Sequence, residues 1–233
     1  MNLGERLTAI AERVPKGAVV ADIGTDHAYL PVYLLQQGLI SHAIAGEVNE
    51  GPYRAACQII DRLNLSKQID LRFGSGFAVL KAGEADTVTI AGMGGTTIID
   101  ILTAHPSVTS ELRRMILQPM IGASLVRQWL VQNGWYITDE TLVEEEGKLY
   151  EIIAAEQGDS PFLESVLYEI GPVLWAQKPI LLAKHIFQLI KQKQYVLAEM
   201  NVSPKARQSV KFREYQESLA KLEEKACQLA AKL

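Results

Sequence analysis

Short apolar segments alternate with helical patterns along the first two thirds of the chain, and this alternation constrains the fold most. Five segments predict strands at 19–23, 43–47, 69–73, 87–91 and 114–117. Helical patterns between and after them lie at 29–37, 52–63, 97–104 and 124–132. Strands joined through helices form a parallel sheet with right-handed crossovers and helices on both faces. We therefore expect an α/β fold that binds ligands at the carboxyl ends of its strands.

Two further strands are predicted at 136–144 and 149–155. The turn between them, Glu145-Glu146-Gly147, is too short for a helical crossover, so these strands must pair antiparallel. Nicotinamide-dependent dehydrogenase domains rarely end in such a hairpin, whereas Rossmann-like S-adenosylmethionine-dependent methyltransferases usually do. The predicted fold class is therefore the Rossmann-like methyltransferase sheet, with parallel strands and a terminal antiparallel hairpin.

Charge and composition change at residue 158. Residues 1–157 contain 12 Lys and Arg against 19 Asp and Glu, a net charge of −7. Residues 158–233 contain 11 against 8, a net charge of +3. We therefore expect two domains with these bounds, an acidic α/β domain and a basic helical domain.

Two long helical patterns in the second domain are separated by Asn201-Val202-Ser203-Pro204. Ser203 as N-cap and Pro204 at the first helical position predict the start of the second helix. Apolar residues repeat with the three-four spacing of a coiled coil, and the short turn predicts an antiparallel hairpin. In the first helix this seam contains Leu182, Ile186, Leu189, Val196 and Met200, with Lys193 as an exception. In the second helix it contains Phe212, Tyr215, Leu219, Leu222, Ala226, Leu229 and Leu233.

Several classes of protein are disfavoured. No apolar run approaches the roughly 20 residues of a membrane span, and the charged N-terminal segment has no signal-peptide core. Cys57 and Cys227 are far apart, and a disulfide scaffold or a zinc site needs more and closer ligands. We expect a cytoplasmic protein that binds neither membrane nor metal, and a monomer, with a dimer left open.

The segment ADIGTDHAYLP, 21–31, predicts a strand, a glycine turn and a helix, as in nucleotide-binding folds. Asp26 stands where many such turns have a second glycine. Glu47 follows Gly24 by 23 residues, at the end of the second predicted strand, where a carboxylate accepts hydrogen bonds from ribose hydroxyls. The alternative for Glu47 is a solvated loop carboxylate. Together the two features favour a nucleoside-containing cofactor.

The ends of the later strands carry further candidates. The third strand leads into Ser75 and Gly76, a position beside the cofactor's adenine in such folds. The fourth leads into the glycine-rich segment 91–95, which is costly to order unless the backbone approaches a ligand. The alternative for that segment is a flexible crossover loop. Gln118-Pro119, after the fifth strand, adds an amide that can both donate and accept hydrogen bonds.

The motifs DIGTDHAYLP, AGEV, IAGMGG and LQP, in this order and followed by a helical hairpin, resemble the bacterial tRNA (adenine-N1)-methyltransferase family that acts on adenosine 22 of the D-arm. The resemblance extends over the whole chain. It implies a class I methyltransferase domain, S-adenosylmethionine as methyl donor, tRNA as substrate, and a C-terminal coiled-coil domain that assists tRNA binding. Ser75 departs from the Asp or Asn that many class I methyltransferases have there, so cofactor affinity is where we expect a difference.

The motifs and the resemblance together predict the site. The expected cofactor contacts are Asp22, Gly24, Thr25, His27, Glu47, Val48, Ser75, Gly76, Ala91, Gly92 and Met93. The expected substrate contacts in the first domain are Gly94, Gly95 and Pro119. Asp22 is expected to fix the turn and the methionine amino group.

Asp26 is the first candidate for a catalytic residue, and Gln118 is the second. Adenine N1 is a lone-pair nucleophile, and a sulfonium methyl is activated by its own leaving group, so transfer needs alignment more than a strong base. A carboxylate beside the ring would accept an N6 hydrogen, orient N1 and stabilise the developing positive charge. The alternative for Asp26 is an N-cap of the following helix. The alternatives for His27 are that it caps a helix or packs against the backbone.

Basic residues near the turn between the two long helices are candidates for binding tRNA phosphates. The predicted contacts are Lys184, Lys191, Lys193, Arg207 and Lys211. A solvated coiled-coil face would explain the same charges without RNA. Two other functions remain open, a methyltransferase for another RNA or a small molecule, and a catalytically inactive cofactor-binding interaction protein.

Overall fold

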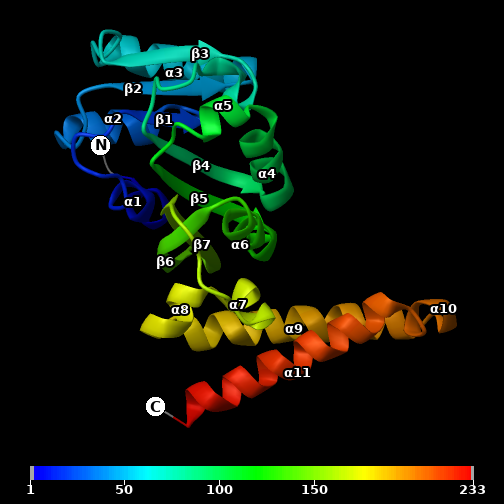
Figure 1. The fold of residues 1–233 in the computed structure, drawn as a ribbon. Helices are drawn as coiled ribbons and strands as arrows, with labels where there is room; N and C mark the ends of the chain where they lie inside the picture. The colour runs from blue at the N-terminus through cyan, green and yellow to red at the C-terminus, as the bar shows by residue number, and fades with distance from the viewer. Residues whose placement is uncertain (1–2, 232–233) are drawn as a thin grey trace. The chain divides into compact units, whose positions relative to one another are not determined.

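The computed structural model describes residues 3–231 and divides into two compact units, Met1–Pro161 and Phe162–Leu233. The first unit contains a seven-stranded sheet in the order β3-β2-β1-β4-β5-β7-β6 (Figure 1). Strands β1 to β5 pair in parallel and β6 pairs antiparallel with β7, as the sequence predicts. The structure adds that β7 also pairs antiparallel with β5 and so lies between β5 and β6. The strands are β1 (Val20–Ile23), β2 (Ala43–Glu47), β3 (Ile69–Phe73), β4 (Thr87–Gly94), β5 (Arg114–Ile121), β6 (Trp135–Glu145) and β7 (Lys148–Gln157).

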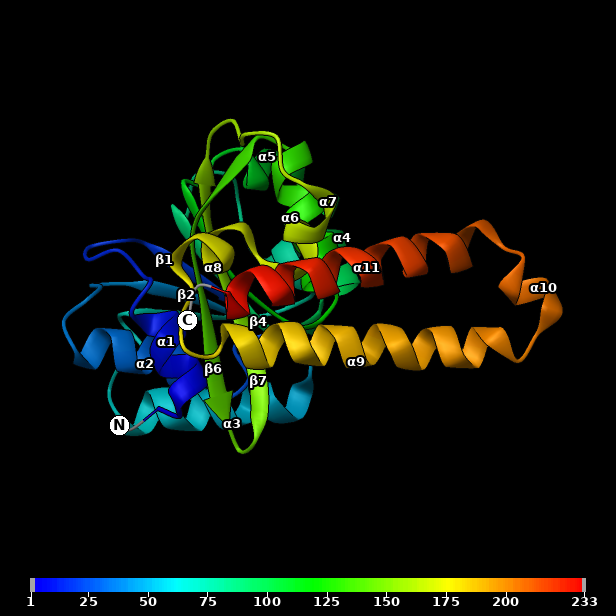
Figure 2. The same ribbon diagram turned by 90° about the horizontal axis from the view of Figure 1, so that it is seen from below.

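Helices cover both faces of this sheet (Figures 1 and 2). On one face lie α1 (Glu5–Ala11), α2 (Tyr29–Gln36) and α3 (Glu50–Arg62). On the other lie α4 (Gly95–Ala104), α5 (Pro106–Thr109) and α6 (Ala123–Gln132), and the short helix η1 (Gly76–Val79) follows β3. Ile10 of α1 and Leu34 of α2 join a core with Val20 and Ile116 of the sheet. Burial of these apolar side chains, about 25 cal/mol per Å², holds the layers together.

The glycine-rich segment after β4 differs from the prediction. The sequence predicts that the fourth and fifth strands end at residues 91 and 117, but both continue, with Met93 opposite Pro119 and Gly94 opposite Ile121. Gly92 has φ +77°, and the register shifts on either side of Met93. Gly92 thus allows a bulge that extends the strands. The alternative of a flexible crossover loop is wrong.

The second unit is helical. It contains α7 (Ser165–Ile170), α8 (Pro172–Gln177), α9 (Leu182–Asn201), α10 (Pro204–Arg207) and α11 (Val210–Ala230). Helices α9 and α11 run antiparallel and contact each other (Figure 1). Leu182 and Ile186 in α9, and Leu222 and Leu229 in α11, are the buried members of the predicted seam. Leu233 lies outside the described residues.

The predicted start of the second long helix is wrong. Ser203 does cap a helix, but that helix, α10, ends at Arg207. Ser209 is in an extended conformation, and its Oγ accepts a hydrogen bond from Phe212 N at 3.1 Å. This second N-cap starts α11 at Val210, so two successive serine caps divide what the sequence pattern presents as one helix.

Lys193, the exception in the predicted seam, is part of the packing of the second unit. Its Nζ forms an ion pair with Glu169 at 2.9 Å and lies 4.6 Å from the centre of the Tyr215 ring. A lysine is tolerated at this seam position because both its charge and its aliphatic stem have partners. Within residues 3–231, no helix is long and apolar enough to cross a membrane.

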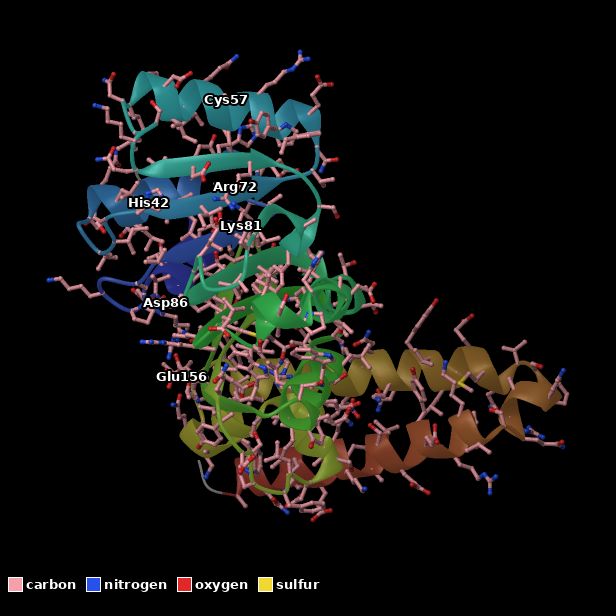
Figure 3. All side chains as sticks on the ribbon, turned by 45° about the horizontal axis from the view of Figure 1, so that its top comes forward. His42, Cys57, Arg72, Lys81, Asp86 and Glu156 are labelled. Atoms are coloured by element: carbon pink, nitrogen blue, oxygen red, sulfur yellow. The ribbon has the colours of Figure 1, made fainter. Side chains whose placement is uncertain are left out.

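Arg72 on β3 fixes the segment that follows this strand (Figure 3). Its Nη1 donates hydrogen bonds to Val79 O and Glu84 Oε2, both at 2.6 Å, and its Nε donates to Asp70 at 2.9 Å. The hydrogen bond from Arg72, followed by that from Lys81 N, lowers the pKa of Glu84 to about 2. Because this folded-state pKa is below the ordinary value of 4.5, the pair stabilises the fold above pH 4.5 and loses this effect as pH falls toward 2.

Glu84→Gln is therefore expected to lower the free energy of unfolding by about 1 kcal/mol at pH 7, because the partly exposed ion pair is removed. At pH 3 the difference in free energy of unfolding between the two proteins should shrink, because the Glu84 ion pair then contributes less to the stability of the wild type. Urea unfolding at both pH values measures this. Exposed Glu111→Gln is the control, and an equal loss at pH 7 and pH 3 would contradict the assignment.

Candidate functional site

Two adjoining cavities lie at the carboxyl ends of β1, β2 and β4, where a parallel sheet places its ligands. Their volumes are about 380 and 440 Å³, and both are lined by Gly24, Val48 and Met93. The predicted cofactor residues in the first cavity are Asp22, Gly24, Thr25, Glu47, Val48, Ala91, Gly92 and Met93. Ser75 and Gly76 line the second cavity. The structure thus brings ten of the eleven predicted cofactor residues to one continuous site.

The turn after β1 needs glycine. Gly24 has φ +73°, and a Cβ atom there would lie 2.2 Å from Met93 Cε. The backbone N–H groups of Gly24 and Thr25 both donate to Gly46 O, at 2.9 and 3.0 Å. This pairing ties the turn to the end of β2, so that the glycine backbone forms part of the cavity wall.

Asp22 is a buried carboxylate beneath this turn. Its Oδ2 accepts a hydrogen bond from Thr25 Oγ1 at 2.7 Å, and its Oδ1 accepts one from Thr89 Oγ1 at 2.5 Å. Burial raises the pKa of Asp22, while the two hydroxyl donors oppose that shift. Asp22 therefore links the turn to β4, in agreement with its predicted role of fixing the turn.

Glu47 is also buried, with 4% of its surface exposed. Its Oε1 accepts from Val48 N, Asn49 N and Asn49 Nδ2, at 2.9, 2.7 and 3.1 Å. Its Oε2 accepts from Asp26 N at 3.1 Å. The alternative of a solvated loop carboxylate is therefore wrong. Among the described residues Oε2 has this single donor, so it keeps acceptor capacity toward the cavity, which fits a nucleoside hydroxyl.

Asp26 has an exposed side chain on a constrained backbone. Its φ is 53°, in the left-handed region, and 64% of its side chain is exposed. The N-cap of α2 is Ala28, and no side chain of the described residues caps this helix. The N-cap alternative for Asp26 is therefore wrong. A left-handed non-glycine residue costs of order 1–3 kcal/mol, and such residues cluster at functional sites. The hydrogen bond from Asp26 N to Glu47 helps to hold it there.

Gln118 is not positioned for direct catalysis. Its side chain is fully buried, and its Oε1 accepts from Arg6 Nη1 at 2.8 Å and from Gly92 N at 3.1 Å. It is absent from the described residues that line the two cavities. The prediction of a catalytic contact is therefore corrected, and Gln118 is a positioning residue for the Gly92 bulge and for Arg6.

Four other predicted contacts also lie outside the described lining of both cavities. His27 stacks on Tyr29 with ring centres 5.3 Å apart. Gly95 is buried, and a Cβ there would lie 2.5 Å from Gly122 O, so its glycine permits close backbone packing. Gly94 pairs with Ile121, and Pro119 is buried in β5. These residues shape the site without contacting its cavities.

Several residues that line the two cavities were not predicted from the sequence, and Arg6 and Tyr29 are two of them. Arg6 of α1 and Tyr29 of α2 line the first cavity, and 39% of the Tyr29 surface is exposed. The Arg6 guanidinium also lies 5.5 Å from the Tyr150 ring centre and 4.0 Å from Glu145. Its partners are more than 100 positions away in the chain, so no local pattern indicates them.

The predicted basic residues of the second unit have different surroundings. Lys191 and Lys211 are exposed and lie near the Phe187 and Tyr215 rings, at 4.6 and 5.9 Å from the ring centres. Arg207 and Lys184 are also exposed. Lys193 is paired with Glu169, so it is less available than the prediction assumes.

Comparisons with known proteins agree with this geometry. The model of the tRNA (adenine(22)-N(1))-methyltransferase family matches residues 20–224. The tRNA (adenine(22)-N(1))-methyltransferase of Bacillus subtilis (strain 168) is 46% identical over 159 residues, which cover 68% of this chain and 67% of that protein. The crystal structure of the B. subtilis M1A22 tRNA methyltransferase TrmK superimposes with a TM-score of 0.87 and 37% identity, covering 97% of this chain and 99% of that one.

Two further solved structures contain the cofactor or its product. Streptococcus pneumoniae Sp1610, in complex with S-adenosyl-L-methionine, has a TM-score of 0.86 and 31% identity, covering 97% of this chain and all of that one. M. capricolum TrmK, in complex with S-adenosyl-homocysteine, has a TM-score of 0.81 and 28% identity, covering 96% and 97%. This chain belongs to the tRNA (adenine(22)-N(1))-methyltransferase family.

Proposed function

We propose that this chain methylates N1 of adenine 22 in tRNA at the cavity between Asp26, Glu47 and the Gly92 bulge, with S-adenosylmethionine as donor. Membership of the family supports the reaction and the cofactor. One observation carries the assignment of the site: the exposed Asp26 carboxylate stands on a left-handed backbone at a cavity lined by the predicted cofactor residues.

The residues of the two cavities fit a bound S-adenosylmethionine. When bound, this cofactor supplies an electrophilic methyl group on a sulfonium. Glu47 Oε2 would accept a hydrogen bond from a ribose hydroxyl of the cofactor, and Ser75 and Gly76, which line the second cavity, would hold its adenine. Asp22 and Thr25 fix the turn that contacts the methionine part.

Asp26 acts on the target base. Its carboxylate accepts a hydrogen bond from the N6 amino group, which orients the N1 lone pair toward the methyl group. As N1 becomes methylated, positive charge develops on the adenine ring, and the nearby carboxylate stabilises it. Such preorganised groups contribute about 3–4 kcal/mol to lowering a barrier. Transfer from a sulfonium to a lone pair needs no metal, so we infer a metal-independent reaction. Because each chain carries a complete set of these residues, a monomer suffices for it.

The helical unit is proposed to bind the tRNA backbone. Residues 162–233 contain 11 Lys and Arg against 7 Asp and Glu, whereas the first unit is acidic. Arg207 and Lys211 are exposed near the ends of α9 and α11 that the short α10 joins, and Lys191 is exposed in the middle of α9. Cations at this end of the hairpin would contact phosphates and release counterions. Lys184 is a further proposed contact.

Replacing Lys191, Arg207 and Lys211 together by glutamine is expected to weaken tRNA binding at least tenfold. The slope of log K against log salt should fall by about 0.7–0.9 for each phosphate that the protein no longer neutralises. Salt-dependent binding titrations measure both quantities. The control replaces exposed Lys16, Lys67 and Lys148 of the first unit, which changes the net charge equally. Equal weakening by the two triple variants would contradict a specific contact by the hairpin.

The activity itself is tested with unmodified tRNA and radiolabelled S-adenosylmethionine. We expect one methyl group on a tRNA with adenine at position 22, recovered as N1-methyladenosine, and none when that base is guanine. Equal methylation of both tRNAs would contradict the assignment. The other functions considered, a methyltransferase for a different substrate and an inactive binding protein, are not favoured by the family match.

A further inference from the structure

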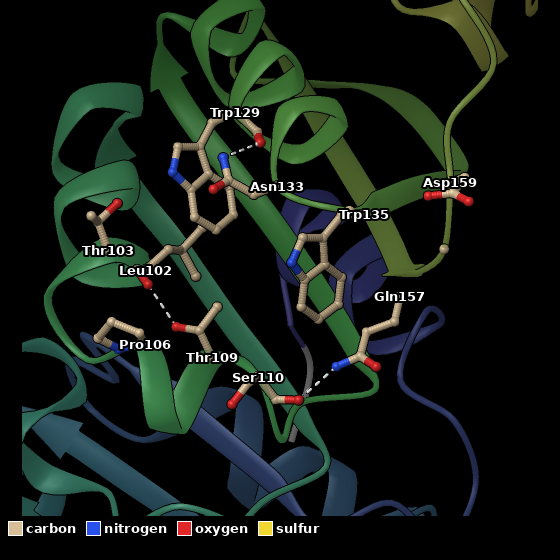
Figure 4. A pocket seen from close by; sticks show the side chains of 12 residues that line it. Leu102, Thr103, Pro106, Thr109, Ser110, Trp129, Asn133, Trp135, Gln157 and Asp159 are labelled. Atoms are coloured by element: carbon tan, nitrogen blue, oxygen red, sulfur yellow. Dashed lines mark hydrogen bonds between the residues drawn. The ribbon is translucent and has the colours of Figure 1, made fainter.

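A separate cavity lies at the opposite end of the sheet from the proposed methyl-transfer site. Figure 4 shows this cavity from close by. Its volume is about 580 Å³. It is formed where α4 and α6 end, where β6 begins and where β7 ends. These are the amino ends of the parallel strands, whereas the cofactor cavities lie at their carboxyl ends. Nothing in the proposed transfer reaction uses this cavity.

A donor that residues 3–231 leave without a protein partner opens onto this cavity from a side chain that is otherwise buried. Trp135 is 3% exposed, and its indole N–H has no hydrogen-bond partner among the described residues. Figure 4 shows its nitrogen turned toward Trp129 and Leu102. The Trp135 nitrogen is not among the buried side-chain atoms of the described residues that lack a partner, so this N–H is open to water or to a ligand in the cavity. The cavity is therefore the place from which this N–H obtains an acceptor.

Neighbouring polar groups are already engaged with the protein. Asn133 Nδ2 donates to Trp129 O at 2.7 Å, Thr109 Oγ1 donates to Leu102 O at 2.6 Å, and Gln157 Nε2 donates to Ser110 O at 2.7 Å (Figure 4). These bonds fix the walls of the cavity without using the Trp135 N–H. Preformed walls with a few polar groups left for a ligand, here the Trp135 N–H and the Thr103 hydroxyl, are typical of small-molecule sites.

The walls also indicate the kind of ligand. The edge of an indole ring is the positive end of its quadrupole, so the Trp135 N–H favours a ligand acceptor and disfavours a cation. Trp129, Leu102 and Pro106 supply aromatic and apolar surface that can pack against a flat ring. Asp159, at the edge of the cavity, can accept a hydrogen bond from a ligand amino group.

We propose that this cavity binds a purine ring, with a ring nitrogen accepting the Trp135 N–H and the base packed against Trp129. The volume is within the range of about 300–1,000 Å³ that ligand pockets have. Two kinds of molecule can supply such a purine ring, a free purine nucleoside and an unpaired base of a bound tRNA. The site is distinct from the cofactor cavities, so its occupation is separable from binding of S-adenosylmethionine.

Adenosine titrated into the full chain tests this, with the cofactor site saturated by S-adenosylhomocysteine. Calorimetry should then detect one adenosine per chain. Trp135→Phe, which keeps the ring but removes the N–H, should weaken adenosine binding about tenfold. Trp129→Leu should weaken adenosine binding by a similar factor. This second variant tests the proposal if Trp135→Phe does not fold. Trp175→Phe in the helical unit is the matched control and should have no effect.

Measuring the KM for tRNA distinguishes between the two sources of the purine ring. If a tRNA base occupies the cavity, Trp129→Leu and Trp135→Phe should also raise the KM for tRNA while leaving affinity for S-adenosylmethionine unchanged. If a free nucleoside occupies it, adenosine affinity falls while the KM for tRNA stays constant. The proposal is overturned if adenosine at millimolar concentration does not bind the saturated chain and neither tryptophan variant changes the KM for tRNA.

Discussion

Replacing Asp26 by glycine is expected to slow methyl transfer to tRNA by at least about a hundredfold, because the carboxylate that orients the base and stabilises its positive charge is removed. Affinity for S-adenosylmethionine should change by less than about threefold, since Asp26 meets the cofactor turn through its backbone. Glycine is the cleanest substitution because it adopts φ 53° without strain. Asp26→Ala should lose as much activity and some stability as well.

Single-turnover transfer and calorimetry with the cofactor separate the two effects. Asp26→Asn keeps the left-handed backbone and a carbonyl acceptor but removes the charge, so its rate should lie between those of the wild type and Asp26→Gly. Asp61→Asn on the exposed side of α3 is a control for loss of a carboxylate. Near-normal turnover of Asp26→Gly would show that Asp26 does not act on the base.

Arg127→Met is expected to lower the free energy of unfolding by about 3–5 kcal/mol, the largest effect on stability that the structure indicates. The side chains of Arg127 and Glu140 are both fully buried. Arg127 Nε contacts Glu140 Oε1 at 2.6 Å, and its Nη2 contacts Glu151 Oε2 at 2.6 Å. Removing the guanidinium takes away the positive charge that lies beside the buried Glu140 carboxylate. The negative charge left in the core is the physical cause of the lower stability.

Urea unfolding of three variants tests this explanation. Arg54→Met breaks an exposed ion pair with Glu50 and should cost less than about 0.5 kcal/mol. Arg127→Met combined with Glu140→Leu should be less destabilised than Arg127→Met alone, because the buried carboxylate is then absent as well. A loss for Arg127→Met as small as that for Arg54→Met would contradict the importance of this buried pair.

The parallel sheet and much of the site could be predicted because their signals are local. Strand segments such as 43–47 and 69–73 have the predicted ends, and the turn at Gly24 can be recognised within a few residues. The role of Gly92 was harder to predict, because a glycine-rich sequence is compatible with a loop or with a bulged strand. Pairing of Met93 with Pro119 decides between them, and that is a contact across the sheet.

The remaining features depend on contacts between distant parts of the chain. Gln118 has the chemistry of a catalytic amide, but its burial and its bond to Arg6 arise only when α1 packs against the sheet. The choice between capping and exposure for Asp26 depends on its backbone angle, which residue type does not determine. In the sequence, Arg127 is a polar residue on a predicted helix, and only the fold shows that its partners are two strand carboxylates, of which Glu140 is fully buried.

The contact between Asp26 and the target base is tested most directly by changing both partners. Single-turnover transfer is measured for the wild type and Asp26→Gly, each with tRNA carrying adenosine or purine riboside at position 22. Purine riboside lacks the N6 amino group, so N1 becomes a weaker nucleophile for both enzymes. We predict that the wild type loses at least about ten times more rate from this change than Asp26→Gly does, because only the wild type also loses a hydrogen bond. An equal loss in both enzymes would contradict the contact.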